Sequence, residues 1–192
     1  MMLPFNLDPA VISWTYLMEF VLVVPLAALA LRKPNQSWQE ALLLNPVPIR
    51  TLVLWLGLLL IYLLLATLCI WLLPVSSTPF MQALSGSQHL GFSLTAVILA
   101  PLMEEIVFRV CGVQLCRKAG LGLIFTLLLT SSLFVLIHFN QYTAPVLLLI
   151  FTFGLMLGLA RIYTDSLLTP VLMHTINNLY AVLLIIWAGV GV

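Results

Sequence analysis

Long apolar stretches separated by short polar connectors dominate the chain. A helix needs about 20 mostly apolar residues to cross a bilayer. Six stretches approach or exceed this length, at residues 11–31, 51–73, 90–115, 121–139, 144–160 and 167–187. The apolar residues run continuously and do not alternate with polar ones, so the pattern predicts helices. We therefore expect an all-α integral membrane protein with about six transmembrane helices.

The basic residues of the connectors predict an orientation. Six of the seven Lys and Arg residues fall in the connectors after the first, third and fifth stretches. Because Lys and Arg concentrate in cytoplasmic loops, this alternation predicts a multi-pass cell-membrane protein with both termini outside the cytoplasm. Glu19 interrupts the first apolar run, which argues against an ordinary cleavable signal peptide there.

Composition excludes several classes of protein. Hydrophobic residues make up 63% of the 192 residues and charged residues only 7%, whereas soluble domains carry about 25% charged residues. A soluble enzyme and a nucleic-acid-binding protein are thereby excluded. The three cysteines lie in or beside apolar stretches and are too few for a disulfide framework. No composition shift marks a boundary, so residues 1–192 are expected to form one polytopic domain.

Charged residues inside a predicted span are costly and usually face the protein interior. Glu104, Glu105 and Arg109 share the third span. Glu105 and Arg109 are four residues apart, so they can form an ion pair on one helix face. Glu104 is then rotated by about 100° around the helix, where a buried carboxylate suits the role of general base. The alternative is an ion cluster that only fixes helix packing.

Further polar residues lie on the later spans at helical spacing. His138 follows Phe134 by four residues and Asn178 follows His174 by four, so each pair shares a helix face. Singly, each pair has a structural explanation, because polar groups inside lipid also join helices by hydrogen bonds. Together, a carboxylate, two imidazoles and a carboxamide on three helices are the groups that peptide-bond hydrolysis requires.

Three motifs carry a family resemblance. They are Glu-Glu-x-x-Phe-Arg at 104–109, Phe-x-x-x-His at 134–138 and His-x-x-x-Asn at 174–178. In this order and spacing they resemble the motifs of the CPBP intramembrane proteases, also called the Abi family. That family includes the type II CAAX prenyl endopeptidases and the bacteriocin-processing or self-immunity proteins. The resemblance covers about half of the chain and implies a catalytic core at about 90–188, on the last four spans.

The resemblance also implies roles for the matching residues. Glu104 would activate water with the help of His138, and His174 and Asn178 would bind the oxyanion. The supporting residues would be Glu105, Arg109 and Phe134. No cofactor is assigned. A zinc ion held by Glu104, His138 and His174 is the alternative to a glutamate-type mechanism, because Glu and His are zinc ligands.

The depth of these residues in the membrane restricts the span limits. With the limits above, Glu104 would lie roughly 20 Å below the outer face while His138 lies almost at that face. The two side chains approach each other if the third span begins nearer Thr95 and the fourth continues past His138. We then expect Glu104, His138 and Asn178 to face one cavity in the outer half of the membrane.

The sequence therefore predicts an intramembrane endopeptidase that cuts a membrane-associated or exported peptide or protein tail. Its partners would be membrane lipid and an extended peptide substrate, with no nucleic acid. The alternative is a non-catalytic immunity or partner-binding protein, or a small transporter, on the same scaffold. Glu19 is expected to be structural, although it could also face the cavity.

Overall fold

The computed structural model describes residues 32–73, 75–86 and 94–188, together with isolated positions between 17 and 29. Every regular element in these ranges is helical, as the apolar pattern predicts. The first predicted span, 11–31, and the beginning of the third lie largely outside the described residues. The described elements are α2 (Trp38–Ala41), α3 (Ile49–Leu72), α4 (Pro79–Gly86), η1 (Thr95–Leu99), α6 (Ala100–Glu105), η2 (Ile106–Gly112), α7 (Val113–Lys118), α8 (Leu123–His138), α9 (Ala144–Thr164) and α10 (Leu168–Ala188).

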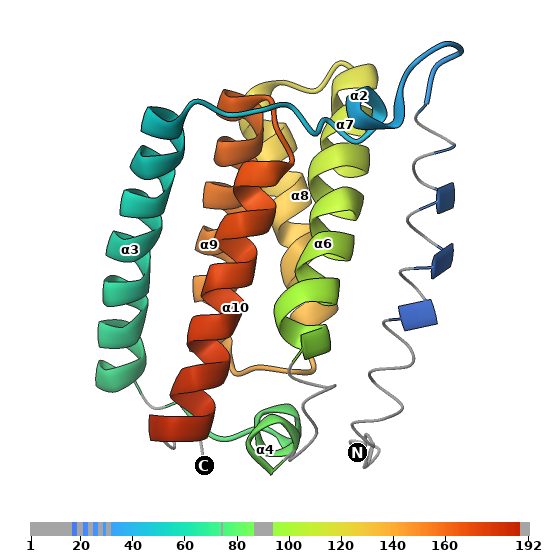
Figure 1. Cartoon of the computed structure of the whole chain (residues 1–192). Helices are drawn as coiled ribbons and strands as arrows, with labels where there is room; N and C mark the ends of the chain where they lie inside the picture. Colours follow the sequence, from blue (N-terminus) through green and yellow to red (C-terminus); the bar gives the residue numbers. More distant parts are fainter. Residues whose placement is uncertain are drawn as a thin grey trace.

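The long helices form an upright bundle in which α10 lies centrally in the view, between α3 on one side and the α6–α7 helix on the other (Figure 1). Three described helices, α3, α9 and α10, are long and apolar enough to cross a membrane, and α8 is a shorter apolar helix. The third predicted span is helical from Thr95 to Lys118, in consecutive α- and π-helical segments. The all-helical membrane class is confirmed, whereas the total of six spans stays a prediction.

Helical structure extends beyond the predicted span limits in two places. Helix α9 continues past residue 160, the predicted limit of the fifth span, to Thr164 and ends at Asp165, whose φ of 46° is left-handed. Arg161 thus lies in the last helical turn, where a cation interacts favourably with the helix dipole. The connector 74–89 contains the unexpected helix α4, whose first turn is capped by a hydrogen bond from the Met81 amide to the Thr78 hydroxyl.

Small residues bring α8 and α9 close together. Gly154 and Gly158 are four residues apart on α9, and a Cβ at Gly158 would lie only 2.7 Å from Leu127 Cδ2 of α8. Such small-residue pairs allow close approach of helices in lipid. Helix α3 instead contacts the bundle through the larger side chains Trp55, Leu59 and Leu63.

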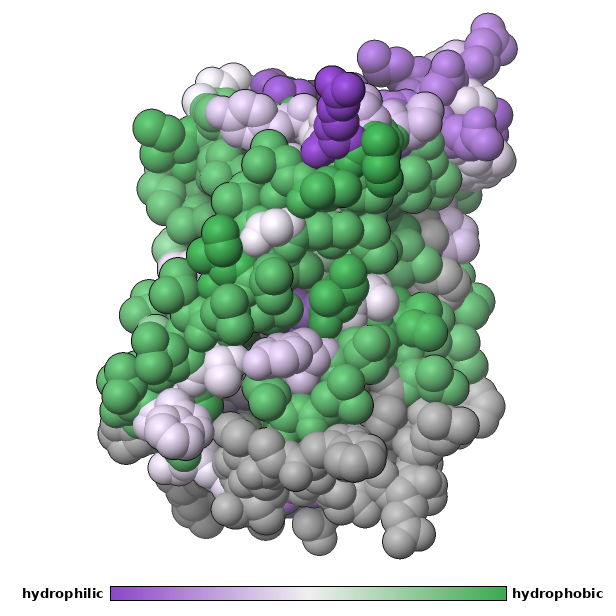
Figure 2. Space-filling view, turned by 60° about the vertical axis from the view of Figure 1, so that its left-hand side comes forward, coloured by the Kyte–Doolittle hydropathy of each residue, from purple (hydrophilic) through white to green (hydrophobic). Residues whose placement is uncertain are grey.

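The surface of the bundle matches a membrane environment. Figure 2 shows a broad hydrophobic band over the helices, with hydrophilic residues gathered at the end that carries α2. The connectors with the basic residues lie at that same end, where α3, α8 and α10 begin (Figure 1). The antiparallel helices thus collect at one end the positive charges that the sequence places in alternate connectors.

Backbone and side-chain bonds join the first connector to the last one. The Leu167 amide donates to the Leu43 carbonyl at 2.8 Å. Asn45 donates to the Asp165 carbonyl at 2.7 Å, and Ser166 donates to the Asn45 carbonyl at 2.7 Å. These bonds fix the beginning of α10, the helix that carries two of the candidate site residues.

Candidate active site

The helix that carries Glu104 and Glu105 is irregular on both sides of them. Pro101 lies near the beginning of α6 and has no amide hydrogen to donate to the preceding turn. The wider π-helical hydrogen bonding of η1 precedes it, with the Ala100 amide donating to the Thr95 carbonyl five residues back. A second π-helical segment, η2, follows Glu105 directly. Such π-turns are rare, and they occur frequently at functional sites.

Glu105 is the centre of a buried charge cluster. Its Oε2 lies 3.1 Å from Arg109 Nε, and both side chains are fully buried. Its Oε1 lies 3.0 Å from Nδ1 of His174, a residue on α10. The predicted pairing of Glu105 with Arg109 is therefore present. The bond from Glu105 to His174 fixes the orientation of the imidazole ring. Because an ionised carboxylate can only accept, Nδ1 of His174 carries the proton of this bond.

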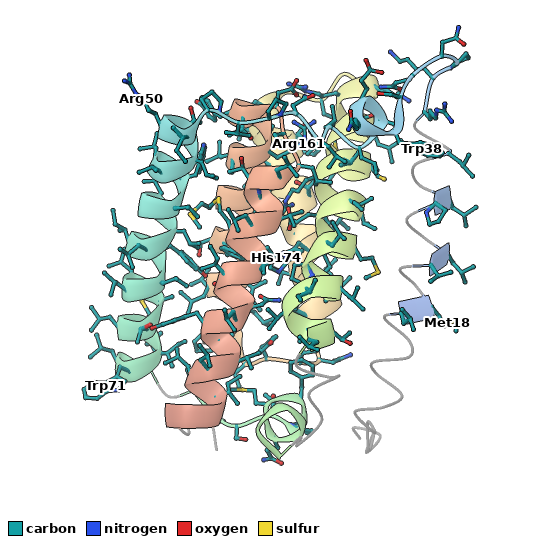
Figure 3. All side chains as sticks on the ribbon, in the orientation of Figure 1. Met18, Trp38, Arg50, Trp71, Arg161 and His174 are labelled. Atoms are coloured by element: carbon teal, nitrogen blue, oxygen red, sulfur yellow. The ribbon has the colours of Figure 1, made fainter. Side chains whose placement is uncertain are left out.

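Glu104 faces the other nitrogen of the same imidazole. His174 Nε2 lies 3.7 Å from Glu104 Oε2, and both residues are buried, at 2% and 4% exposure. This distance exceeds that of a direct hydrogen bond. Figure 3 shows that His174 lies well inside the bundle, far from either end of α10.

Aromatic rings enclose the two imidazoles. The buried ring of Phe134 lies 4.8 Å from the His138 ring and 5.6 Å from the His174 ring. The guanidinium of Arg109 lies over the same Phe134 ring, 5.3 Å from its centroid. Phe153 contacts His174 edge-on. Phe134 thus contacts three of the polar groups, which explains its position in the second motif.

Hydrogen bonds define the orientation of His138 and Asn178. His138 Nδ1 lies 2.7 Å from the Phe134 carbonyl, which can only accept, so Nδ1 carries a proton and a neutral imidazole presents Nε2 as an acceptor. Asn178 Nδ2 donates to the Ala96 carbonyl at 2.9 Å, and its Oδ1 accepts from Asn177 at 3.2 Å. These bonds use one of the two Nδ2 hydrogens of Asn178, so the second hydrogen can donate to another group.

Two cavities meet at these residues. The smaller, which we name the Glu104 cavity, has a volume of about 60 Å³ and is lined by Glu104, His138 and Asn178 among others. The larger, which we name the α3 cavity, has a volume of about 140 Å³ and lies among α3, α8, α9 and α10. His138 and Asn178 line both cavities, together with Tyr142 and Ala181.

The depth problem is solved differently from the expectation. Helix α8 ends at His138 and does not continue past it, whereas the beginning of the third span near Thr95 stays a prediction, because residues 87–93 lie outside the described part of the chain. Glu104 and His138 nevertheless line one cavity. The sequence missed Tyr142, whose ring stacks on that of His138 at 6.1 Å. It missed Tyr142 because a tyrosine in a polar turn carries no distinguishing signal.

A metal ion is poorly accommodated by this arrangement. Among the described residues, no group of three or more His, Cys, Asp and Glu side chains converges as metal ligands would. The residues proposed as alternative zinc ligands, Glu104, His138 and His174, thus do not form a zinc site in this conformation.

Comparisons with known proteins find a family model that matches the segment with the site. Residues 86–180 match the family model described as "Type II CAAX prenyl endopeptidase Rce1-like". The chain is also 36% identical, over 113 residues, to an "Uncharacterized 24.3 kDa protein" of Escherichia coli. That alignment covers 53% of this chain and 49% of the relative, so the chain spans about half the length of the curated relative it matches. No solved structure matches the chain.

The matched segment contains all three motifs and every candidate site residue, from Glu104 to Asn178. The family resemblance predicted from the motifs is confirmed by this match. Over residues 86–180, slightly less than half of its length, the chain is similar to the Rce1-like type II CAAX prenyl endopeptidases.

Proposed function

We propose that the protein is an intramembrane endopeptidase in which Glu104 activates a water molecule. One observation carries the proposal: Glu104, His138 and Asn178, from three different helices, line one small cavity. A cavity needs roughly 10–15 Å³ and two to four polar partners to hold a water molecule. The Glu104 cavity meets both conditions.

The reaction would proceed by general base catalysis. Glu104 takes a proton from the water while the neutral His138 holds the water through Nε2, and the hydroxide attacks the scissile carbonyl carbon. The spare Nδ2 hydrogen of Asn178 and Nε2–H of a protonated His174 donate to the oxyanion. Glu104 then returns the proton to the leaving amine as the carbon–nitrogen bond breaks.

The charge balance of the buried cluster supports a protonated His174. Glu104 and Glu105 carry two negative charges and Arg109 carries one positive charge, so a neutral cluster requires one more cation. Protonation of His174 supplies it. Its Nδ1–H then bonds to Glu105, whereas its Nε2–H lies 3.7 Å from Glu104, beyond hydrogen-bond distance, and stays available for the oxyanion. Net charge inside a membrane is costly, so the neutral combination is favoured.

The substrate would be a membrane-associated or exported peptide or protein tail. We further propose that the end with the basic connectors faces the cytoplasm, because Lys and Arg concentrate on that side. Labelling of single cysteines introduced at Lys118 and at Asn140 with a membrane-impermeant maleimide tests this orientation. Labelling in intact cells is expected at residue 140 only, and the reverse result would invert the orientation.

The decisive experiment compares wild-type protein with Glu104→Gln. The amide keeps the size of the side chain and removes its basicity, so cleavage should fall by about 10²–10⁴-fold. Protein termini in membrane and secreted fractions of the host are compared at equal abundance of the two proteins. New ends that disappear in the variant would establish proteolysis.

The matched control is Glu40→Gln, which changes an exposed carboxylate at the other end of the bundle. Glutamine can replace glutamate in the capping box that Glu40 forms with Ser37, so this variant should cleave normally. Identical termini for wild type and Glu104→Gln would contradict the proposal. They would favour a non-catalytic immunity or partner-binding protein, or a transporter. A loss of cleavage with a chelator would bring back the zinc alternative.

A further inference from the structure

The α3 cavity is too large for a water site and adjoins the proposed one. Its wall is mostly apolar and includes Leu63, Ala66 and Ile70 of α3. It is continuous with the proposed site, because His138 and Asn178 line both cavities. An apolar cavity of about 150 Å³ accepts a benzene-sized molecule. At about 140 Å³, the α3 cavity has room for one large apolar side chain.

The tyrosine hydroxyl groups in this cavity act as acceptors. Thr67 donates its hydroxyl proton to the Leu63 carbonyl, so the 2.7 Å contact between Thr67 and Tyr180 requires Tyr180 to donate. Tyr62 donates to the Leu149 carbonyl at 2.9 Å. These hydroxyl protons are in use, so the tyrosine oxygens offer lone pairs to an incoming group. The lone pairs of these tyrosine oxygens suit the backbone N–H groups of a peptide.

The charges around the two cavities also disfavour a carboxylate. Among the described lining residues, neither cavity includes a Lys or Arg. Arg109 is paired with Glu105 and does not line either cavity. A protonated His174, which lines the α3 cavity, already lies between the carboxylates of Glu105 and Glu104. Glu104, when ionised, would repel a second carboxylate. A free C-terminus therefore finds no cation without a carboxylate partner among the described residues of the site.

From these observations we infer that the α3 cavity selects the substrate by binding one large apolar side chain next to the cut bond, without binding a free C-terminus. This inference rests on the proposed endopeptidase function. It defines the substrate as an extended peptide segment with an internal Leu-, Met- or Phe-sized residue beside the cleavage position. The protein would not recognise the free C-terminus of the substrate.

The test uses the full chain reconstituted in lipid nanodiscs. The probe is a peptide pool with two adjacent internal positions randomised, prepared with free and with amidated C-termini, and cleavage is followed by mass spectrometry. Wild-type protein should enrich Leu, Met and Phe at one position beside the cut, and amidation should change the rate by less than about threefold. A much slower cleavage of the amidated pool would overturn the inference.

Two variants change the size of the cavity in opposite directions. Ala66→Leu narrows it and should reduce kcat/KM for the Phe peptide relative to the Val peptide by about 10-fold or more. Ile70→Ala changes a half-buried residue and should shift the preference towards Trp. The control is Leu64→Ala, because Leu64 is 62% exposed on the same helix, and its preference should equal that of wild type.

The outcomes separate the two proposals. An unchanged preference in both Ala66→Leu and Ile70→Ala, while Glu104→Gln abolishes cleavage, would overturn the inference and leave the proposed function intact. If Ala66→Leu does not fold, Ile70→Ala alone decides this point. If wild type and Glu104→Gln treat the pool identically, the proposed function fails, and the inference fails with it.

Discussion

Helix α3 and the core of α8, α9 and α10 are similarly apolar, yet they pack in opposite ways. In α9, Gly154 and Gly158 bring the backbone against α8. In α3, a Cβ added at Gly57 would meet nothing within 4 Å, and large side chains keep the helix at a distance. In the membrane-length segment of α3, 17% of the residues are buried, compared with 33% in α9 and in α10. The core is therefore the better packed region.

This difference shows what holds a bundle together in lipid. Lipid tails are as apolar as leucine, so hydrophobicity alone does not bring helices together. Close packing of small residues and buried polar bonds hold the core. Helix α3 lacks both along most of its length, and the α3 cavity remains between it and the core. The predictions below test whether this contrast in packing is also a contrast in stability.

The largest effect is expected from the charge cluster in the core. Glu105→Ala leaves Arg109 buried without its carboxylate, and removing one partner of a buried ion pair costs about 3–5 kcal/mol. Unfolding by SDS in mixed micelles, followed by circular dichroism, measures this free energy. The double variant Glu105→Leu/Arg109→Met should recover most of the stability while cleavage stays low, because His174 loses its orienting bond. A cost below about 1 kcal/mol for Glu105→Ala would mean that the core does not depend on this pair.

A smaller effect is expected from overpacking. Gly158→Ile forces side-chain atoms against Leu127, and overpacking a tight contact costs about 1–3 kcal/mol. The same unfolding measurement applies. Its counterpart on the other region is Gly57→Ile, which should have no measurable cost because the position is open. Equal losses at the two glycines would remove the packing contrast between α9 and α3.

The smallest effect is expected where the two regions meet. Tyr180→Phe removes the hydroxyl that bonds Thr67 across α10 and α3, and such bonds in membranes contribute about 0.6 kcal/mol on average, and at most about 1.7. Thermal unfolding in nanodiscs is sensitive enough to detect this change. The comparison variant is Tyr163→Phe, because Tyr163 is 73% exposed at the end of α9. A loss much greater than the upper value would show that α3 is an integral part of the core.

Local spacing in the sequence predicted some contacts and could not predict others. The four-residue spacing of Glu105 and Arg109 predicted their ion pair because the contact lies within one helix. The bond from Glu105 to His174 spans 69 residues and depends on how two helices meet, which local periodicity does not specify. The π-helical turns around Glu104 were missed for a similar reason, because a single proline in a long apolar run does not determine how the helix accommodates it.

The bonds between the first and last connectors have a consequence for biosynthesis. Asn45 and its partner Asp165 are separated by 120 residues. At a synthesis rate of about 5–20 residues per second, Asn45 is made roughly 6–24 s before Asp165. During that interval the ribosome is still producing the helices that carry Glu104 and His138. The connection that fixes the beginning of α10 therefore forms late, and the site is completed only after the residues up to Asn178 have been translated.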